Sequence, residues 1–228
     1  MNQQHEYIGT RKLLIGIVLA VITFWLFANS LINVIPNLQT SFGSYLSTIS
    51  IAVSLTALFC GMFVVGAGSL ADYFGRVRLT IIGLWLNIFG SLLIIVSDYI
   101  PLLLMGRAIQ GLSAALIMPA TLSLIKAYYH GDKRQRALSL WSIGSWGGSG
   151  FASLFGGMIA TFLSWRWIFV FSIIVPLIAV LLIKGTPESK NQHASSRQFD
   201  IVGLILLVVM MLSLNTVSYT HLRAHETK

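Results

Sequence analysis

The residues best placed to do chemistry are polar side chains that interrupt long apolar runs. Arg107 lies within the otherwise uncharged stretch Tyr99–Ile125, and Gln110 and Gly111 follow it at i+3 and i+4. Residues at these spacings share one face of a helix. A charged residue at the centre of a bilayer costs about 2.5–3.5 kcal/mol on insertion scales. Arg107 is therefore expected to face a cavity or a partner, and extension of its side chain to the outer headgroups is the alternative.

A second charged cluster lies between two apolar runs. A carboxylate lies between two glycines, and two arginines follow the second glycine. These residues are Gly68, Asp72, Gly75, Arg76 and Arg78. Glycine permits a tight turn, and opposite charges at helix ends can hold one conformation through ion pairs and helix dipoles. We interpret this loop as a conformational latch. A plain cytoplasmic loop rich in basic residues explains the composition equally well.

A third pattern consists of small residues at regular spacing. Gly144, Gly148, Ala152 and Gly156 recur every four residues, and Gly157 follows directly. Glycine costs a helix about 1 kcal/mol relative to alanine, so this pattern indicates close contact with another helix or a bend needed for motion. The sequence does not distinguish static packing from gating.

Apolar runs must form the elements that position these residues. The chain has 228 residues, 56% hydrophobic and 10% charged, which excludes a water-soluble globule. A helix crosses the hydrocarbon core in about 20 residues. The composition therefore predicts an all-α polytopic membrane protein with six spans: Leu13–Ile35, Leu46–Ala71, Leu79–Ser97, Tyr99–Ile125, Ala137–Trp165 and Trp167–Ile183.

Basic residues gather in alternate loops. The loops at 36–45, 97–101 and 164–167 contain a single one, Arg166. An excess of Lys and Arg marks the cytoplasmic side, so the N-terminus is predicted to be cytoplasmic. The net charge of +8 thus reflects topology and not nucleic-acid binding. The basic residues of the cytoplasmic loops are Arg11, Lys12, Arg76, Arg78, Lys126, Lys133, Arg134, Arg136, Lys184, Lys190 and Arg197.

The chain divides into four parts by composition. Residues 1–184 form a six-helix N-terminal domain, 185–200 a polar cytoplasmic linker and 201–216 the start of a seventh helix. Residues 217–228 resemble a translated sequencing adapter and are excluded from the fold. A metal-binding tail through His221 and His225 is the less favoured alternative.

No enzymatic or metal chemistry is expected. Cys60 is the single cysteine and lies in an apolar run, so it supports neither a disulfide nor a cysteine metal site. A membrane enzyme or receptor would need paired carboxylates, an activated nucleophile or metal ligands in the spans, and none is present.

The three motifs together resemble those of the major facilitator superfamily. The 68–78 loop resembles the signature between helices two and three. Arg107-x-x-Gln110-Gly111 resembles the proton-coupling motif of helix four, and the segment from Gly148 to Gly157 is similar to the antiporter motif of helix five. Residues 8–216 also resemble the fourteen-helix drug:proton antiporter group, which includes quinolone and multidrug efflux pumps of Gram-positive bacteria.

This resemblance implies a protein of the bacterial plasma membrane that exports small amphipathic drugs, driven by the proton gradient without a cofactor, and hence antibiotic resistance. The chain would then be an N-terminal fragment whose main partner, besides lipid, is the missing C-terminal half. A carrier of another substrate class is the first alternative. A membrane enzyme or receptor is the distant one.

The chain departs from the family pattern at several positions. Tyr73 and Val77 replace basic residues of the loop motif. Ala152-Ser153 replaces the usual Gly-Pro, so a kink in helix five is not assumed. The six predicted spans contain no carboxylate, which places the proton acceptor in the missing half or at Asp98.

Overall fold

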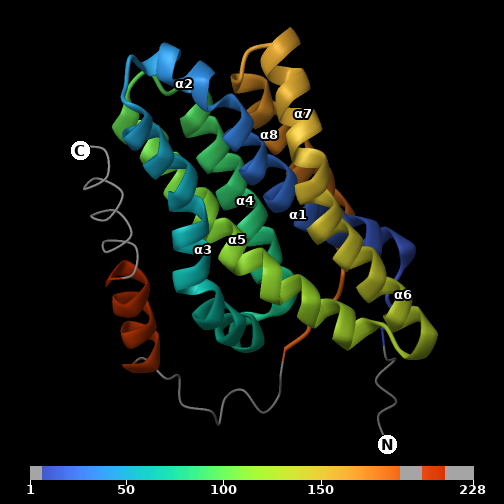
Figure 1. Ribbon diagram of the computed structural model, residues 1–228. Coiled ribbons are helices and arrows are strands. Elements are labelled where there is room, and N and C mark those ends of the chain that lie inside the picture. The colour runs from blue at the N-terminus through green and yellow to red at the C-terminus, as the bar shows by residue number, and fades with distance from the viewer. Residues whose placement is uncertain (1–6, 191–201, 214–228) are drawn as a thin grey trace, which may run out of the picture.

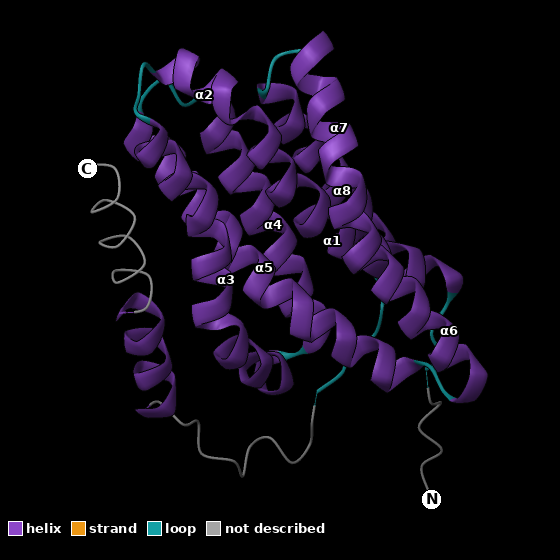
Figure 2. Cartoon of the chain, in the orientation of Figure 1, coloured by secondary structure: helices purple, strands orange, loops and turns teal. Residues whose placement is uncertain are grey.

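The computed structural model describes residues 7–190 and 202–213, and every regular element in these ranges is helical (Figure 2). The all-α prediction is therefore confirmed. The helices are α1 (Arg11–Ser30), η1 (Leu31–Val34), α2 (Ile35–Phe42), α3 (Leu46–Phe74), α4 (Arg76–Ile95), α5 (Ile100–Tyr128), α6 (Gly131–Ser142), η2 (Ile143–Gly147), α7 (Gly148–Phe162) and α8 (Arg166–Ile183), followed by a short apolar helix, Val202–Ser213.

Most of the predicted spans correspond to long apolar helices. Five helical stretches of the described residues are long and apolar enough to cross a membrane: Arg11–Phe42, Leu46–Phe74, Arg76–Ile95, Ile100–Tyr128 and Arg166–Ile183. The remaining predicted span, 137–165, falls on α6, η2 and α7, which follow one another without a break. Its middle portion, η2, is a π-helical turn and not regular α-helix.

The first predicted span ends too early. A loop was predicted from Pro36, but α2 continues the helical path to Phe42. Pro36 lies in the first turn of α2, where its missing N–H leaves no hydrogen bond unmade, and Leu38 is fully buried. The helix ends at Gly43, whose φ of 57° lies in the left-handed region that favours glycine.

The helices form two groups around the middle of the bundle (Figure 1). α3 and α4 both pack against α5, whereas α1 packs against α7 and α8, and α8 also contacts α4. Separate apolar clusters occupy the two ends, one around Leu13, Leu124 and Ile183 and one around Leu38 and Phe169. These clusters pack against both ends of α5 and so determine where the polar residues between them, Arg107 and Gln110, lie.

Some predicted segments fall outside the described residues. These are residues 191–200 of the linker, residues 201 and 214–216 of the seventh helix, and the whole of 217–228, including His221 and His225.

Candidate functional site

Arg107 lies in the middle of the bundle between α5 and α3. Its side chain is only 1% exposed. Nε donates a hydrogen bond to the Ala52 carbonyl (3.1 Å) and Nη2 to the Val53 carbonyl (3.4 Å). Nη1 donates to Oε1 of Gln110 (2.9 Å), and Thr56 Oγ1 donates to the Arg107 carbonyl (3.1 Å). The guanidinium group thus joins α5 to the backbone of α3.

This position decides between the two interpretations of Arg107. A side chain that extended to the headgroups would be exposed at its tip, so the headgroup alternative is wrong. The expectation was a cavity or a partner, and the structure shows partners: the backbone carbonyls of Ala52 and Val53 and the side-chain oxygen of Gln110. A cavity facing the remainder of the complete protein stays a prediction.

Gln110 continues this polar contact into a buried chain of hydrogen bonds. Its Nε2 donates to Ser91 Oγ (2.9 Å), and Ser91 Oγ lies 3.2 Å from Ser172 Oγ. Asn87 Nδ2 donates to the Ser172 carbonyl (2.8 Å). Polar groups on α5, α4 and α8 are therefore connected. Sequence reasoning missed Ser91 and Ser172, for which no signal exists, whereas Asn87 was visible as an amide within an apolar run.

Gly111 allows α3 and α5 to approach closely. A Cβ atom at this position would lie 2.6 Å from the Thr56 carbonyl oxygen and 2.6 Å from Phe59 Cβ. Any larger residue would push the two helices apart and lengthen the Arg107 contacts. The predicted motif of Arg107, Gln110 and Gly111 is thus assembled at one helix contact.

The predicted latch is a single-residue turn with an ion pair. Gly75 alone separates α3 from α4, with φ of 120°. Asp72 Oδ1 accepts hydrogen bonds from Arg76 Nε (3.0 Å) and Nη2 (2.8 Å). Gly68, by contrast, lies within α3, where a Cβ atom would make an ordinary 3.6 Å contact with Pro119. The prediction that Gly68 forms part of the turn is therefore wrong.

Glu188, which sequence reasoning missed, binds this turn from the linker. Its Oε1 accepts the Val77 N–H (2.9 Å) and its Oε2 the Arg78 N–H (3.0 Å), so the carboxylate caps α4. Arg76 contributes a further bond to the linker through its N–H, which the Ser189 carbonyl accepts (3.1 Å). A Cβ atom on Gly75 would lie 2.4 Å from Glu188 Cδ. Glu188 is the only carboxylate in the sequence between Asp132 and Asp200, and this isolation could have marked it as a candidate partner for the arginines of the turn.

We expect Asp72→Asn to lower the transport that the motif resemblance implies for the complete protein by up to about fivefold, because partly exposed ion pairs are worth about 0–1 kcal/mol. The Asp72 side chain is 35% exposed, so its loss alters the balance between conformations more than it alters folding. Drug efflux at matched membrane abundance measures the effect. Asp98→Asn is the control, since Asp98 is 90% exposed in its pair with Arg166. Undiminished efflux by Asp72→Asn would contradict the latch.

The small residues of α7 form its contact with α1. A Cβ atom on Gly156 would lie 2.7 Å from the Ser30 carbonyl oxygen, and Ser30 Oγ donates to the Ala152 carbonyl (3.1 Å). Gly157, in contrast, has nothing within 4 Å of a Cβ position. Close helix packing therefore accounts for the four-residue spacing but not for Gly157.

A π-helical turn, Ile143–Gly147, precedes this contact. Gly144 lies within the turn and Gly148 directly follows it, and both approach α1. A Cβ atom on Gly144 would lie 3.3 Å from Val18 Cγ1, and one on Gly148 would lie 3.2 Å from Trp25 Cβ. Such turns occur frequently at functional sites. Here the turn carries Trp146, which stacks on Trp25 with ring centroids 5.7 Å apart and remains 70% exposed. α1 and η2 therefore present an aromatic surface beside their glycine contact.

Comparisons with known proteins agree with this architecture. The chain is 68% identical over 207 residues to the quinolone resistance protein NorB of Staphylococcus aureus strains Newman and USA300, with 91% of this chain covered. It spans 45% of the length of those relatives. Among solved structures, a D-xylose-proton symporter superposes with a TM-score of 0.68 at 16% identity, covering 91% of this chain and 52% of that one. A peptide transporter in complex with sulfate gives 0.69 at 15% identity, covering 96% and 49%.

These structures share the fold alone at such low identity. A model of the Major Facilitator Superfamily matches residues 13–223, which include all three motifs. The helical bundle, the motif contacts and this match lead to one conclusion: the chain belongs to the Major Facilitator Superfamily.

Proposed function

We propose that the complete protein is a proton-coupled multidrug efflux transporter of a bacterial plasma membrane. The observation that carries the proposal is the 68% identity to proteins named for quinolone resistance, across 91% of this chain. Residues 1–184 serve as its six-helix N-terminal domain, 185–200 as a linker and 201–216 as the beginning of a seventh helix. The N-terminus and the basic loops lie on the cytoplasmic side.

The stacked indoles of Trp25 and Trp146 support an aromatic substrate class. Trp146 is 70% exposed on a face made by α1 and η2, so its indole is accessible to a flat molecule beside the stack. Aromatic pairs gain about 0.5–1.5 kcal/mol beyond simple area burial. We assign this surface to small amphipathic drugs with fused rings, such as quinolones.

Arg107 supports proton coupling through its buried positive charge, with Gln110 and Gly111 maintaining its position. The carboxylate that exchanges the proton is assigned to the remainder of the complete protein. Asp98 is a poor candidate, because it is 90% exposed and lies 3.6 Å from Arg166 Nη2. The proton gradient takes the place of a cofactor in this mechanism.

The test is energy-dependent efflux of norfloxacin and ethidium from a pump-deficient bacterium that expresses the complete gene. We expect both compounds to be exported and a protonophore to abolish export. Trp146→Ala should reduce ethidium efflux about tenfold at most, since an aromatic stack is worth about 0.5–1.5 kcal/mol. Trp85→Ala, on α4 and 51% exposed, is the matched control. Absence of efflux in expressing cells would refute the proposal, and export of other compounds alone would assign another substrate class.

A further inference from the structure

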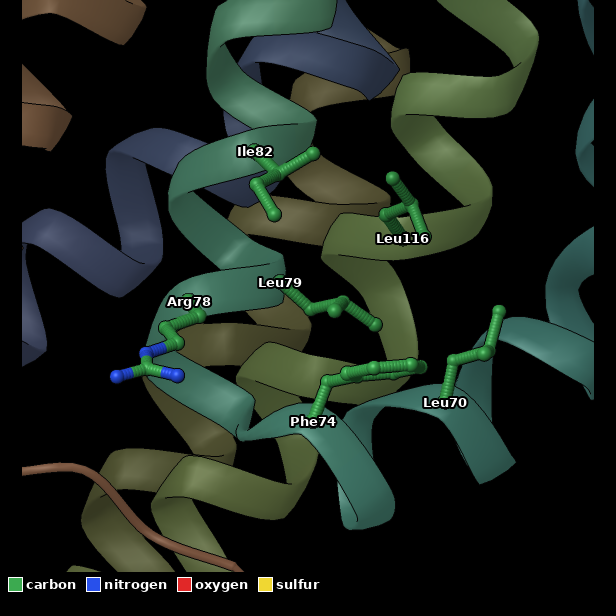
Figure 3. A pocket seen from close by; sticks show the side chains of 6 residues that line it. All are labelled: Leu70, Phe74, Arg78, Leu79, Ile82 and Leu116. Atoms are coloured by element: carbon green, nitrogen blue, oxygen red, sulfur yellow. The ribbon is translucent and has the colours of Figure 1, made fainter.

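An apolar groove opens between α3 and α4 near the Gly75 turn. Its volume is about 480 Å³. All but one of the lining side chains are apolar, and they come from α3, α4 and α5 (Figure 3). They are Leu70 and Phe74 of α3, Leu79 and Ile82 of α4, and Leu116 of α5, with Arg78 as the sixth.

The groove results from how the helices pack. α3 and α4 meet at Gly75, and each packs extensively on α5 but little on the other. They diverge from the turn, and Leu116 of α5 lies between them. Phe74 and Ile82 remain 51% and 50% exposed. Both flanking helices are candidate membrane spans, so the groove lies between two segments long and apolar enough to cross a membrane.

One end of the groove carries a positive charge. Arg78 lies at its edge, with the guanidinium group pointing away from the apolar side chains (Figure 3). The side chain is 71% exposed, and its Nε lies 3.9 Å from Glu188 Oε2. At 3.9 Å this contact is an ion pair and not a hydrogen bond, so the guanidinium donors of Arg78 remain available to a second anion.

The charged end of the groove lies at the basic end of the bundle. The Tyr128 hydroxyl at the end of α5 donates to the Pro187 carbonyl, next to Glu188. Lys126 and Lys133 lie beside this end of α5. An amphipathic ligand whose charged group lies near Arg78 would therefore place its apolar portion along the groove, between the two candidate membrane spans.

We propose that this groove binds one acyl chain of an anionic phospholipid whose phosphate contacts Arg78. An apolar groove inside the bilayer is filled by hydrocarbon, and a basic residue at its interfacial end selects a negative headgroup. Phosphatidylglycerol has this chemistry. A free phosphate ion lacks the chain that the five apolar residues would contact, and a zwitterionic lipid lacks the net charge.

The experiment is photocrosslinking of the complete protein in nanodiscs with phosphatidylglycerol that carries a diazirine in its acyl chain. We expect labelled peptides from residues 70–82. Arg78→Gln should reduce the labelling about fivefold, the effect of one basic residue near an anionic surface. Ile82→Trp should abolish it by filling the groove while retaining Arg78. Lys133→Gln, which removes an exposed charge at the same end but outside the groove, should leave it unchanged.

Two kinds of result would overturn this proposal. Equal labelling by photoactivatable phosphatidylcholine, or an equal loss with Lys133→Gln, would remove the specific role of Arg78. Labelling that persists in Ile82→Trp, or is absent from the complete protein because its other half covers the groove, would remove the lipid site. Thermal unfolding midpoints equal to the parent's must accompany any loss of labelling by the variants.

Discussion

Arg107→Ala should reduce the proposed proton-coupled transport by the complete protein at least tenfold while leaving membrane insertion intact. Hydrogen bonds to a charged group contribute about 1.5–3 kcal/mol each, and a change of about 1.4 kcal/mol alters a rate tenfold. The variant loses the bonds to the Ala52 and Val53 carbonyls and leaves Gln110 Oε1 without this donor. Insertion does not suffer, since removing a charge makes a helix easier to place in lipid.

Arg107→Lys separates charge from geometry. Lysine retains the positive charge but has one nitrogen in place of a planar fork, so it cannot reach Ala52 and Gln110 together as arginine does. We therefore expect partial efflux with an altered dependence on external pH. The altered profile follows if the charge at this position tunes the proton affinity of a carboxylate in the complete protein.

Efflux measured against external pH at matched abundance tests both variants. Lys126→Ala serves as control because Lys126 is an exposed basic residue on the same helix, α5. A merely structural role for Arg107 predicts lower stability of both variants without any change in pH profile. Normal pumping by both variants would exclude any role for the buried charge.

Gly156→Ala is expected to destabilise the protein markedly, whereas Gly157→Ala should not. The new methyl group at Gly156 would lie 2.7 Å from the Ser30 carbonyl oxygen and 3.2 Å from Ser30 Cα. These are backbone atoms of α1, so relief requires separation of α1 and α7 along their contact. Overpacking of this kind costs about 1–3 kcal/mol.

Gly157→Ala is a matched control one position away. Nothing lies within 4 Å of its Cβ position, and alanine favours a helix by about 0.5–1 kcal/mol over glycine. Thermal unfolding of the complete protein in detergent should therefore show a lower midpoint for Gly156→Ala and an unchanged or higher one for Gly157→Ala. Equal midpoints would show that α1 and α7 do not pack as described.

Much of the architecture was predictable because membrane spans are determined locally. Runs of about 20 apolar residues have no other stable placement in a chain with this little charge. The common helix face of Arg107, Gln110 and Gly111 follows from spacing alone. The family resemblance rested on these same motifs, and the match over residues 13–223 confirms it.

Boundaries and special turns were less predictable. The continuation of the first helix through α2 depends on burial of Leu38, a tertiary contact that overrides the loop signal of Pro36. The π-helical turn at Ile143–Gly147 has no composition that separates it from regular helix. Such features depend on the neighbouring helix and not on local propensity.

The sequence by itself indicated where most of the apolar spans lie, that basic residues gather in alternate loops, and which residues form the three motifs. Only the tertiary structure decided what those motifs contact. Ser172 reaches Ser91 and Glu188 reaches the turn at Gly75 across about a hundred residues of chain, roughly the size of a small domain. Helix packing brings such residues together through the shapes of whole faces, and no local pattern encodes which two faces meet.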